Sequence, residues 1–268
     1  MEARMKAELG GDLYNACDAG DLPAVLGYIS QQRSRNPAFN PSLGAMMYVA
    51  ASRDHSAIVQ HCLASGGKVS DELLQCIIVD RPFKTYETIL KAKAIDVNCY
   101  VPWLGDVLTC VATEDDIAFA KLCLSYGADP NRNLFEEYKT ALAAVAETAS
   151  VEMAALLLDH GANLKKSGAT AAAAAAGKID MVQFLLARGA DIDEMGLYHP
   201  FDRRYDEMVG SALHQAIRKG DNDLVSLLFE KGADVNLKDV HGRTPLALAE
   251  GERKDTIISM VKDHGLSQ

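Results

Sequence analysis

The stretch from Gly210 to Asn236 reads GSALHQAIRKGDNDLVSLLFEKGADVN and has the hydrophobic pattern of two short helices. Apolar residues recur three and four positions apart, which places them on one face of a helix. They are Ala212, Leu213, Ala216 and Ile217 in the first run, and Leu224, Val225, Leu227 and Leu228 in the second. Gly220 and Gly232 follow the two runs, and glycine is a common helix stop signal. Because neither helix is long enough to be stable alone, the pair must pack its apolar faces against similar pairs.

Versions of this unit recur along most of the chain. A closing Gly-Ala-Asp or Gly-Ala-Asn follows an aliphatic doublet at Gly127, Gly161, Gly189 and Gly232. We therefore predict one domain over residues 1–268 that contains eight copies. Their approximate bounds are 11–44, 45–70, 71–105, 106–139, 140–167, 168–210, 211–243 and 244–268. A short helix over Glu2–Leu9 is predicted to cap the first copy, because the terminal units of such arrays need a polar outer face.

The unit resembles an ankyrin repeat, whose signature is T-P-L-H-x-A followed by a second helix and G-A-D-V-N. Thr244, Pro245 and Leu246 keep the first part of that signature, and His214 keeps the histidine. The resemblance implies an all-α solenoid of stacked helix–turn–helix units joined by β-hairpin fingers, with a concave contact face. It also implies that the His214 imidazole ties loop backbone together.

Composition indicates a globular protein without nucleic-acid or membrane partners. Apolar residues make up 49% and charged residues 24%, and the formal net charge is −10. Such a charge disfavours nucleic-acid backbones and anionic membrane surfaces. The chain has no apolar run long enough to span a bilayer, and its N-terminus lacks a secretory h-region. We expect a soluble protein that is not secreted and lies in the cytoplasm, with the nucleus as the alternative.

The cysteines and histidines do not predict a metal site, and no cofactor is expected. The six cysteines lack C-x-x-C spacing, and no His-x-x-x-His spacing appears. In the repeat register most cysteines fall at positions of buried small residues. Cys110 is expected to be partly exposed, and Cys99, in a finger, is the best candidate for a reactive thiol. His55 and His61 are expected to be solvated.

An insertion distinguishes the sixth copy from the others. Gly189 and Gly232 are 43 residues apart, whereas Gly232 and Gly265 are 33 apart, and the extra length falls in residues 193–210. This enlarged finger is rich in aromatic and arginine residues, which concentrate at binding surfaces. We predict as binding residues Tyr198, His199, Phe201, Arg203, Arg204 and Tyr205. We also predict as binding residues the aromatic residues of two other fingers, which are Tyr100, Trp103, Phe135 and Tyr138. The alternative for the insertion is that its aromatic residues cover the base of the loop itself.

The ankyrin resemblance places the ends of the inner helices on the concave face. Glu114, Glu147 and Arg218 are therefore predicted to contribute to binding. The run ATAAAAAAG, from Ala169 to Gly177, is both a strong helix former and a low floor for a recess between them. Tight helix packing alone would also explain several of these alanines. We predict a pocket here, closed by the Tyr198–Tyr205 loop.

Two functional classes are compatible with these features. The favoured one is a protein-interaction module that binds a protein partner through the concave face and fingers, since the chain lacks the common nucleotide-binding and hydrolase motifs. The alternative is a small-molecule-binding protein or a cofactor-free acid–base enzyme that dehydrates, isomerises or cyclises its substrate. Its acid and base candidates would be His199, Asp202, Glu147 and Glu114, which would need a water-poor pocket to act.

Overall fold

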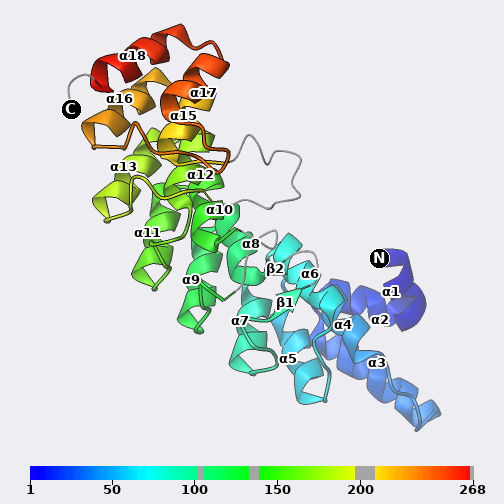
Figure 1. Cartoon of the computed structure of the whole chain (residues 1–268). Coiled ribbons are helices and arrows are strands. Elements are labelled where there is room, and N and C mark those ends of the chain that lie inside the picture. The colour runs from blue at the N-terminus through cyan, green and yellow to red at the C-terminus, as the bar shows by residue number, and fades with distance from the viewer. Residues whose placement is uncertain (102–104, 133–138, 197–208, 266–268) are drawn as a thin grey trace. The chain divides into compact units, whose positions relative to one another are not determined.

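The computed structural model describes residues 1–101, 105–132, 139–196 and 209–265. These residues form short helices with very little strand, which confirms the predicted all-α class (Figure 1). The chain forms two compact units. Unit 1 comprises Met1–Val107 and Leu122–Ala128, and unit 2 comprises Leu108–Lys121 and Asp129–Gln268.

Unit 1 consists of a first helix followed by antiparallel helix pairs. Helix α1 spans Glu2–Leu9, as predicted, and packs on α2 and α4. The helices that follow are α2 (Gly11–Asp18), α3 (Leu22–Arg35), α4 (Leu43–Ala51), α5 (Ser56–Ala64), α6 (Asp71–Asp80) and α7 (Phe83–Lys91). Strands β1 (Tyr100–Val101) and β2 (Gly105–Asp106) then form an antiparallel ladder in which Tyr100 is opposite Asp106. This ladder is the β-structure of one finger.

Unit 2 continues the same pairing of an inner and an outer helix. Its helices are α8 (Val107–Thr113), α9 (Ile117–Ser125), α10 (Ala141–Thr148), α11 (Val151–Asp159), α12 (Ala169–Ala176), α13 (Ile179–Ala187), α15 (Ala212–Lys219), α16 (Asn222–Glu230), α17 (Pro245–Gly251) and α18 (Asp255–Gly265). Helices α8 and α9 each extend into unit 1 by part of their length. The inner helices α10, α12, α15 and α17 pack on one another in series, and α11 packs on α13 in the outer row.

Local sequence explains where these helices begin and what they bury. Hydroxyl or carboxylate side chains stand just before many of them and accept a hydrogen bond from a backbone N–H of the first turn, as Ser42, Thr140 and Asp221 do. The positions at helical spacing are buried, including Leu213, Ala216 and Ile217 on α15. Helix formation and core packing therefore follow from the same repeated pattern.

A lysine or histidine side chain of one repeat donates a hydrogen bond to a backbone carbonyl at the end of the inner helix of the preceding repeat. The Lys178 Nζ donates to the Ala149 carbonyl at 2.7 Å, and the Lys254 Nζ donates to the Arg218 carbonyl. In unit 1 the corresponding contact joins His55 Nε2 to the Asp18 carbonyl at 2.9 Å. The expectation that His55 is solvated is therefore wrong. A positive charge near the last carbonyls of a helix is favourable because of the helix dipole.

A second set of contacts joins consecutive fingers through asparagine side chains. In unit 2 the Asn131 Nδ2 donates to the Gly161 carbonyl at 2.8 Å, while its Oδ1 accepts from the Asn163 N–H at 2.8 Å. In unit 1 Asn98 donates to the Gly127 carbonyl in the same way. Asn131 is the fourth residue after Gly127, the glycine that closes the preceding helix pair. Asn98 is the fourth residue after Ala94, which stands in place of that glycine.

Asp193 occupies this asparagine position in the sixth copy and keeps only half of the interaction. Its Oδ1 accepts from the Asp234 N–H at 3.0 Å, but an ionised carboxylate cannot donate to a carbonyl. Burial raises the pKa of Asp193, and the charges of Asp234 and Asp191 raise it further. The ionised Asp193 is therefore less favourable in the folded chain than in the unfolded one.

We expect Asp193→Asn to stabilise unit 2 by about 1 kcal/mol at neutral pH, the typical net value of one hydrogen bond. The new amide would donate to the Gly232 carbonyl, as Asn131 does to Gly161. Urea denaturation followed by far-UV circular dichroism measures the gain. Because the folded-state pKa of Asp193 is raised, the wild-type chain loses stability as the pH rises through that pKa. The difference between variant and wild type should therefore shrink on acidification, and a difference that grows instead would contradict the assignment.

Candidate functional site

A hollow of about 480 Å³ lies on the inner helices of unit 2. We call it the α12 hollow, because α12 forms its floor and α10 and α15 contribute its sides. It is lined by Lys139, Ala143, Glu147, Gly168, Ala171, Ala172, Ala175, Ala176, Gly196, Gln215, Arg218, Lys219 and Glu252. Its volume falls within the range of about 300–1,000 Å³ that is usual for binding pockets.

The alanine run of α12 serves packing on one face and the hollow on the other. Ala169, Ala173 and Ala174 have no exposed surface, and α12 packs against α10, α13 and α15. Ala175 is exposed, and it lines the hollow together with the half-buried Ala172 and Ala176. The buried alanines of the run thus allow close helix packing, and the alanines on the other face form the floor of the hollow.

One side of the hollow carries a close ion pair. The Lys139 ammonium lies 2.6 Å from the Glu147 carboxylate, and the exposed fractions of the two side chains are 8% and 34%. Such a short charge-assisted contact in a partly buried site fixes both side chains. Glu147 stands at the end of α10, where its register on the helix directs it to the hollow.

The opposite side is held by a hydrogen-bonded group centred on Arg218. Its guanidinium donates to the Val209 carbonyl and lies 3.5 Å from the Asp239 carboxylate, and its side chain is 11% exposed. Gln215, one helical turn earlier on α15, also donates to the Val209 carbonyl, at 3.1 Å. This side of the hollow is therefore held by several hydrogen bonds and includes a guanidinium group.

The carboxylate of Asp239 is buried and accepts several hydrogen bonds. Its donors are the His241 and Arg243 N–H groups and the Arg243 guanidinium, at 2.8–2.9 Å. Burial by itself acts to raise the pKa of Asp239, but the hydrogen bonds from Arg243 and His241 outweigh it, and the pKa is lowered. Asp239 thus stays ionised and balances the charge of Arg218.

His214 connects the seventh and eighth copies behind this group. Its Nδ1 accepts from the Ser211 N–H at 3.3 Å, and its Nε2 donates to the Arg243 carbonyl at 3.2 Å. Burial lowers the pKa of His214, which favours the neutral imidazole that this arrangement requires. Its expected role in tying loop backbone together is confirmed.

Family models match two stretches of the chain. Residues 108–195 match a model described as ankyrin repeats (3 copies), and residues 204–249 match one described as ankyrin repeats (many copies). The helix pairs and the His214 contacts agree with these matches. The chain belongs to the ankyrin-repeat family. Its fold is accordingly an all-α ankyrin solenoid.

Curated proteins share short stretches with this ankyrin chain. A serine/threonine-protein kinase VIK of Arabidopsis thaliana is 48% identical over 63 residues, which are 24% of this chain and 14% of the kinase. A putative ankyrin repeat-containing protein of Treponema pallidum is 36% identical over 66 residues, 25% of this chain and 22% of that protein. Protein phosphatase 1 regulatory subunit 12A of Mus musculus is 38% identical over 66 residues, 25% of this chain and 6% of the subunit. In all three cases the match spans less than a quarter of the relative's length.

Two of the predicted binding residues line the α12 hollow, and two others do not. Glu147 and Arg218 contribute to its opposite sides. Glu114 is exposed at the end of the preceding inner helix and is not part of the lining, and Tyr100, 50% exposed, lies on β1 in unit 1. The other predicted residues lie outside the described part of the ankyrin chain. They are Trp103, Phe135, Tyr138, Tyr198, His199, Phe201, Asp202, Arg203, Arg204 and Tyr205.

The described residues show where the insertion leaves the ankyrin array. The Gly196 N–H donates to the Gly210 carbonyl at 2.9 Å, so the two ends of residues 197–208 are joined. Gly196 itself lines the hollow. The insertion therefore starts at the edge of the α12 hollow, while the prediction that it closes a pocket concerns residues that the structure does not describe.

Sequence reasoning missed Lys139, Gln215 and Glu252 in the lining. Gln215 could have been found, because it is three positions before Arg218 and residues so spaced share a helix face. Lys139 and Glu252 reach the hollow from a finger and from the end of α17, and no periodic pattern predicts their direction. The family resemblance indicated only the last positions of each inner helix.

The remaining sequence predictions concern thiols, metals and membranes. Cys110 is buried, so the expectation that it is partly exposed is wrong. Cys99 is half-buried, and its pKa is raised mainly by burial, which opposes thiolate formation and does not favour the predicted reactive thiol. Within the described ranges no three His, Cys, Asp or Glu side chains gather in a way that could bind a metal ion. Nor is any helix in those ranges both long and apolar enough to cross a membrane.

Proposed function

We propose that this ankyrin array is a protein-interaction module and that the α12 hollow receives a side chain of its protein partner. The observation that carries this proposal is the hollow itself, with an alanine floor between two charged sides that are already fixed. Ankyrin arrays expose extended concave surfaces that proteins use for binding. A recess that is formed before binding loses little entropy when a partner side chain enters it.

The floor and sides favour a partner with an aliphatic side chain next to polar groups. Ala172, Ala175 and Ala176 offer methyl groups and no hydrogen-bonding side chain. At the edge, Glu147 and Glu252 are paired with Lys139 and Lys254 at 2.6 and 3.4 Å, each carboxylate side chain is 34% exposed, and Lys219 supplies a positive charge. A flexible aliphatic residue such as leucine or methionine would displace water from the floor, while its neighbours could pair with these charges.

The comparisons support a module of this class without identifying the partner. The Mus musculus relative is by its name a regulatory subunit of a protein phosphatase, and the Treponema pallidum relative is named for its ankyrin repeats. A regulatory subunit must bind another protein. We propose protein binding, and no more specific activity, for this chain.

The enzymatic alternative is less well supported by the described residues. Of its four acid and base candidates, Glu147 is paired with Lys139 at 2.6 Å and Glu114 is exposed outside the hollow. A general base needs an accessible lone pair in a site with little water. His199 and Asp202 lie outside the described residues, so catalysis would depend on them.

Filling the hollow tests the proposal. We expect Ala175→Leu to abolish the recovery of a co-purifying polypeptide when the protein is isolated from its own host and examined by native mass spectrometry. The matched control is Ala57→Leu, which adds the same side chain at an exposed position of α5. A second variant, Arg203→Ala with Arg204→Ala, tests whether the insertion contributes to the same interaction.

The outcomes separate the two functional classes. Loss of a polypeptide from Ala175→Leu but not from Ala57→Leu supports the module and assigns the hollow to it. A bound small molecule that is lost from the same variant would instead establish the alternative. Recovery of the same partner from both variants would show that binding does not use the hollow.

A further inference from the structure

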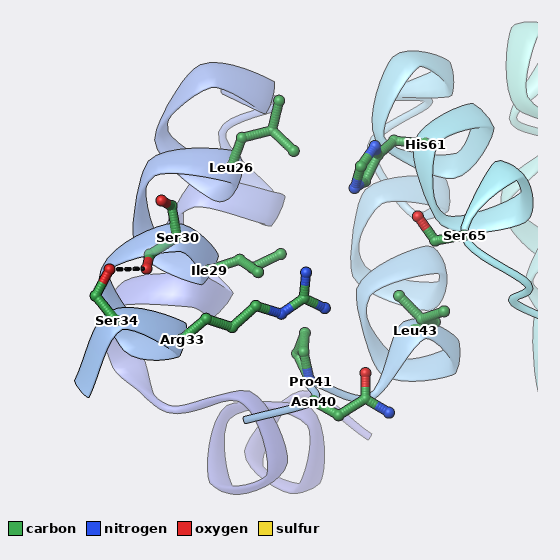
Figure 2. Close-up of a pocket in the computed structure, with 10 residues that line it drawn as sticks. All are labelled: Leu26, Ile29, Ser30, Arg33, Ser34, Asn40, Pro41, Leu43, His61 and Ser65. Atoms are coloured by element: carbon green, nitrogen blue, oxygen red, sulfur yellow. Dashed lines mark hydrogen bonds between the residues drawn. The ribbon is translucent and has the colours of Figure 1, made fainter. Parts of the chain in front are cut away.

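A second hollow lies in unit 1, between the outer helices α3 and α5. We call it the α3–α5 groove. Its volume is about 500 Å³, and all of its lining residues belong to unit 1. Figure 2 shows Arg33 extending from α3 into the space between the helices, with His61 and Ser65 facing it from α5 and its end.

The lining of the groove is free of acidic residues in a strongly acidic chain. None of the ten residues that line it is Asp or Glu, although the whole chain has a formal net charge of −10. Helix α3 contains no acidic residue at all and has both Arg33 and Arg35 in its last turn. The groove is therefore a locally positive site, and a negatively charged group is its natural ligand.

The polar groups around the groove have unused hydrogen-bonding capacity. The Arg33 Nε donates to the Phe39 carbonyl at 3.3 Å, which holds the side chain in place and leaves the two terminal nitrogens directed into the groove. Arg33 makes no ion pair with any described residue, and the His61 ring and Ser65 hydroxyl make no hydrogen bond with one. A guanidinium whose terminal nitrogens are available can bind a carboxylate through two parallel hydrogen bonds.

An apolar wall adjoins these polar groups. Leu26 is 41% exposed, Ile29 lies one turn further along α3, and Leu43 faces them from α4 (Figure 2). An exposed leucine with aliphatic neighbours gains free energy when a partner covers it. The groove thus combines one site for an anion with one for an aliphatic side chain.

We propose that the α3–α5 groove binds an acidic segment of a partner protein, with one carboxylate between Arg33 and His61 and one aliphatic side chain on Leu26. A carboxylate carries a single charge, which matches the single guanidinium of the groove. The exposed wall at Leu26 favours a segment of a larger partner over a free small molecule, because small-molecule sites usually enclose most of their ligand.

The spacing of the two contacts determines the pattern of the segment. Leu26 and Arg33 are seven residues apart on α3, which corresponds to about 10 Å along a helix at 1.5 Å per residue. A peptide in the polyproline II conformation has three residues per turn and rises about 9 Å over three residues, so its side chains i and i+3 lie on the same side at about that distance. The segment should therefore have a leucine and a glutamate three positions apart, and the probe uses the order leucine, then glutamate.

The probe is the peptide acetyl-Gly-Leu-Ser-Ser-Glu-Gly-amide, titrated into the full-length chain and followed by nuclear magnetic resonance of its backbone and methyl groups. The comparison peptide has glutamine in place of glutamate. We expect saturable shifts at Leu26, Ile29 and Leu43 with the first peptide, and binding at least tenfold weaker with the second. Arg33→Gln should weaken binding of the first peptide by at least tenfold.

The matched control for that variant is Arg35→Gln, which removes the same charge from the same helical turn but not from the groove lining. It should bind the peptide like the wild-type chain. Equal losses in the two variants would mean that only general charge attraction is involved, and no shift at 5 mM peptide would overturn the proposal. Octanoate binding more tightly than the peptide would reassign the groove to a free small carboxylate. Ala175→Leu, which fills the α12 hollow, should leave peptide binding unchanged, so this result is independent of the proposed function.

Discussion

Asp239→Ala should lower the stability of unit 2 by about 3–5 kcal/mol, the usual cost of removing one partner of a buried ion pair. The Asp239 side chain has no exposed surface and lies 2.8 Å from the Arg243 guanidinium and 3.5 Å from that of Arg218. Its removal takes a carboxylate away from the Arg218 guanidinium, whose side chain is only 11% exposed. The free energy of unfolding from urea denaturation, followed by far-UV circular dichroism, measures the loss.

The control is Asp223→Ala, which removes an exposed carboxylate from the first turn of α16. Its effect should stay within about 1 kcal/mol, because an exposed charge near a helix N-terminus contributes no more than that. Similar losses from the two variants would show that Asp239 does not neutralise the arginines.

The Asp239 contribution also has a defined dependence on pH. The pKa of Asp239 in the folded chain is lowered, because the hydrogen bonds from Arg243 and His241 together outweigh the opposing effect of burial. A lowered carboxyl pKa contributes stability that is complete above the unfolded value of about 4 and is lost as the pH falls below it. The difference between wild type and Asp239→Ala should therefore be constant near neutral pH and decrease on acidification.

Asp239 also illustrates what the sequence could not predict. Helical spacing predicted the helix pairs, and the position of each inner helix end placed Glu147 and Arg218 on one surface. These inferences depend on apolar residues that recur with the helical period of 3.6, a pattern that is present in many segments of the chain. Asp239 lies in a finger, where no periodic pattern relates sequence position to burial, so its contact with Arg218 was not foreseen.

The same distinction explains the other residues that were missed or misjudged. Lys139 enters the α12 hollow from a finger, and His55 finds the Asp18 carbonyl in the preceding repeat. Both contacts depend on how consecutive repeats are placed relative to each other. A hydrophobic pattern within one repeat carries no information about that placement. Cys110 is buried although it lies one place earlier than the usual buried position, because all residues from Val107 to Ala112 on α8 are buried.

Ala173→Leu should destabilise unit 2 by about 1–3 kcal/mol, the typical cost of adding methylene groups to a well-packed core. Ala173 has no exposed surface and belongs to α12, which packs against α10 and α15 on its two sides. A leucine there would force these helices apart or adopt a strained rotamer. Urea denaturation midpoints and slopes of the wild-type and variant chains measure the effect.

Ala175→Leu provides the matched comparison, because it makes the same change two residues along the same helix. Ala175 is exposed in the α12 hollow, so the added side chain has room, and we expect a change within about 0.5 kcal/mol. Alanine and leucine differ little in helix propensity, so the contrast between the two variants reports packing alone. A large loss from both would mean that the hollow has no space for a side chain, which would remove the basis of the proposed binding site. A loss from Ala173→Leu alone means that the alanine run both holds three helices together and leaves an accessible floor.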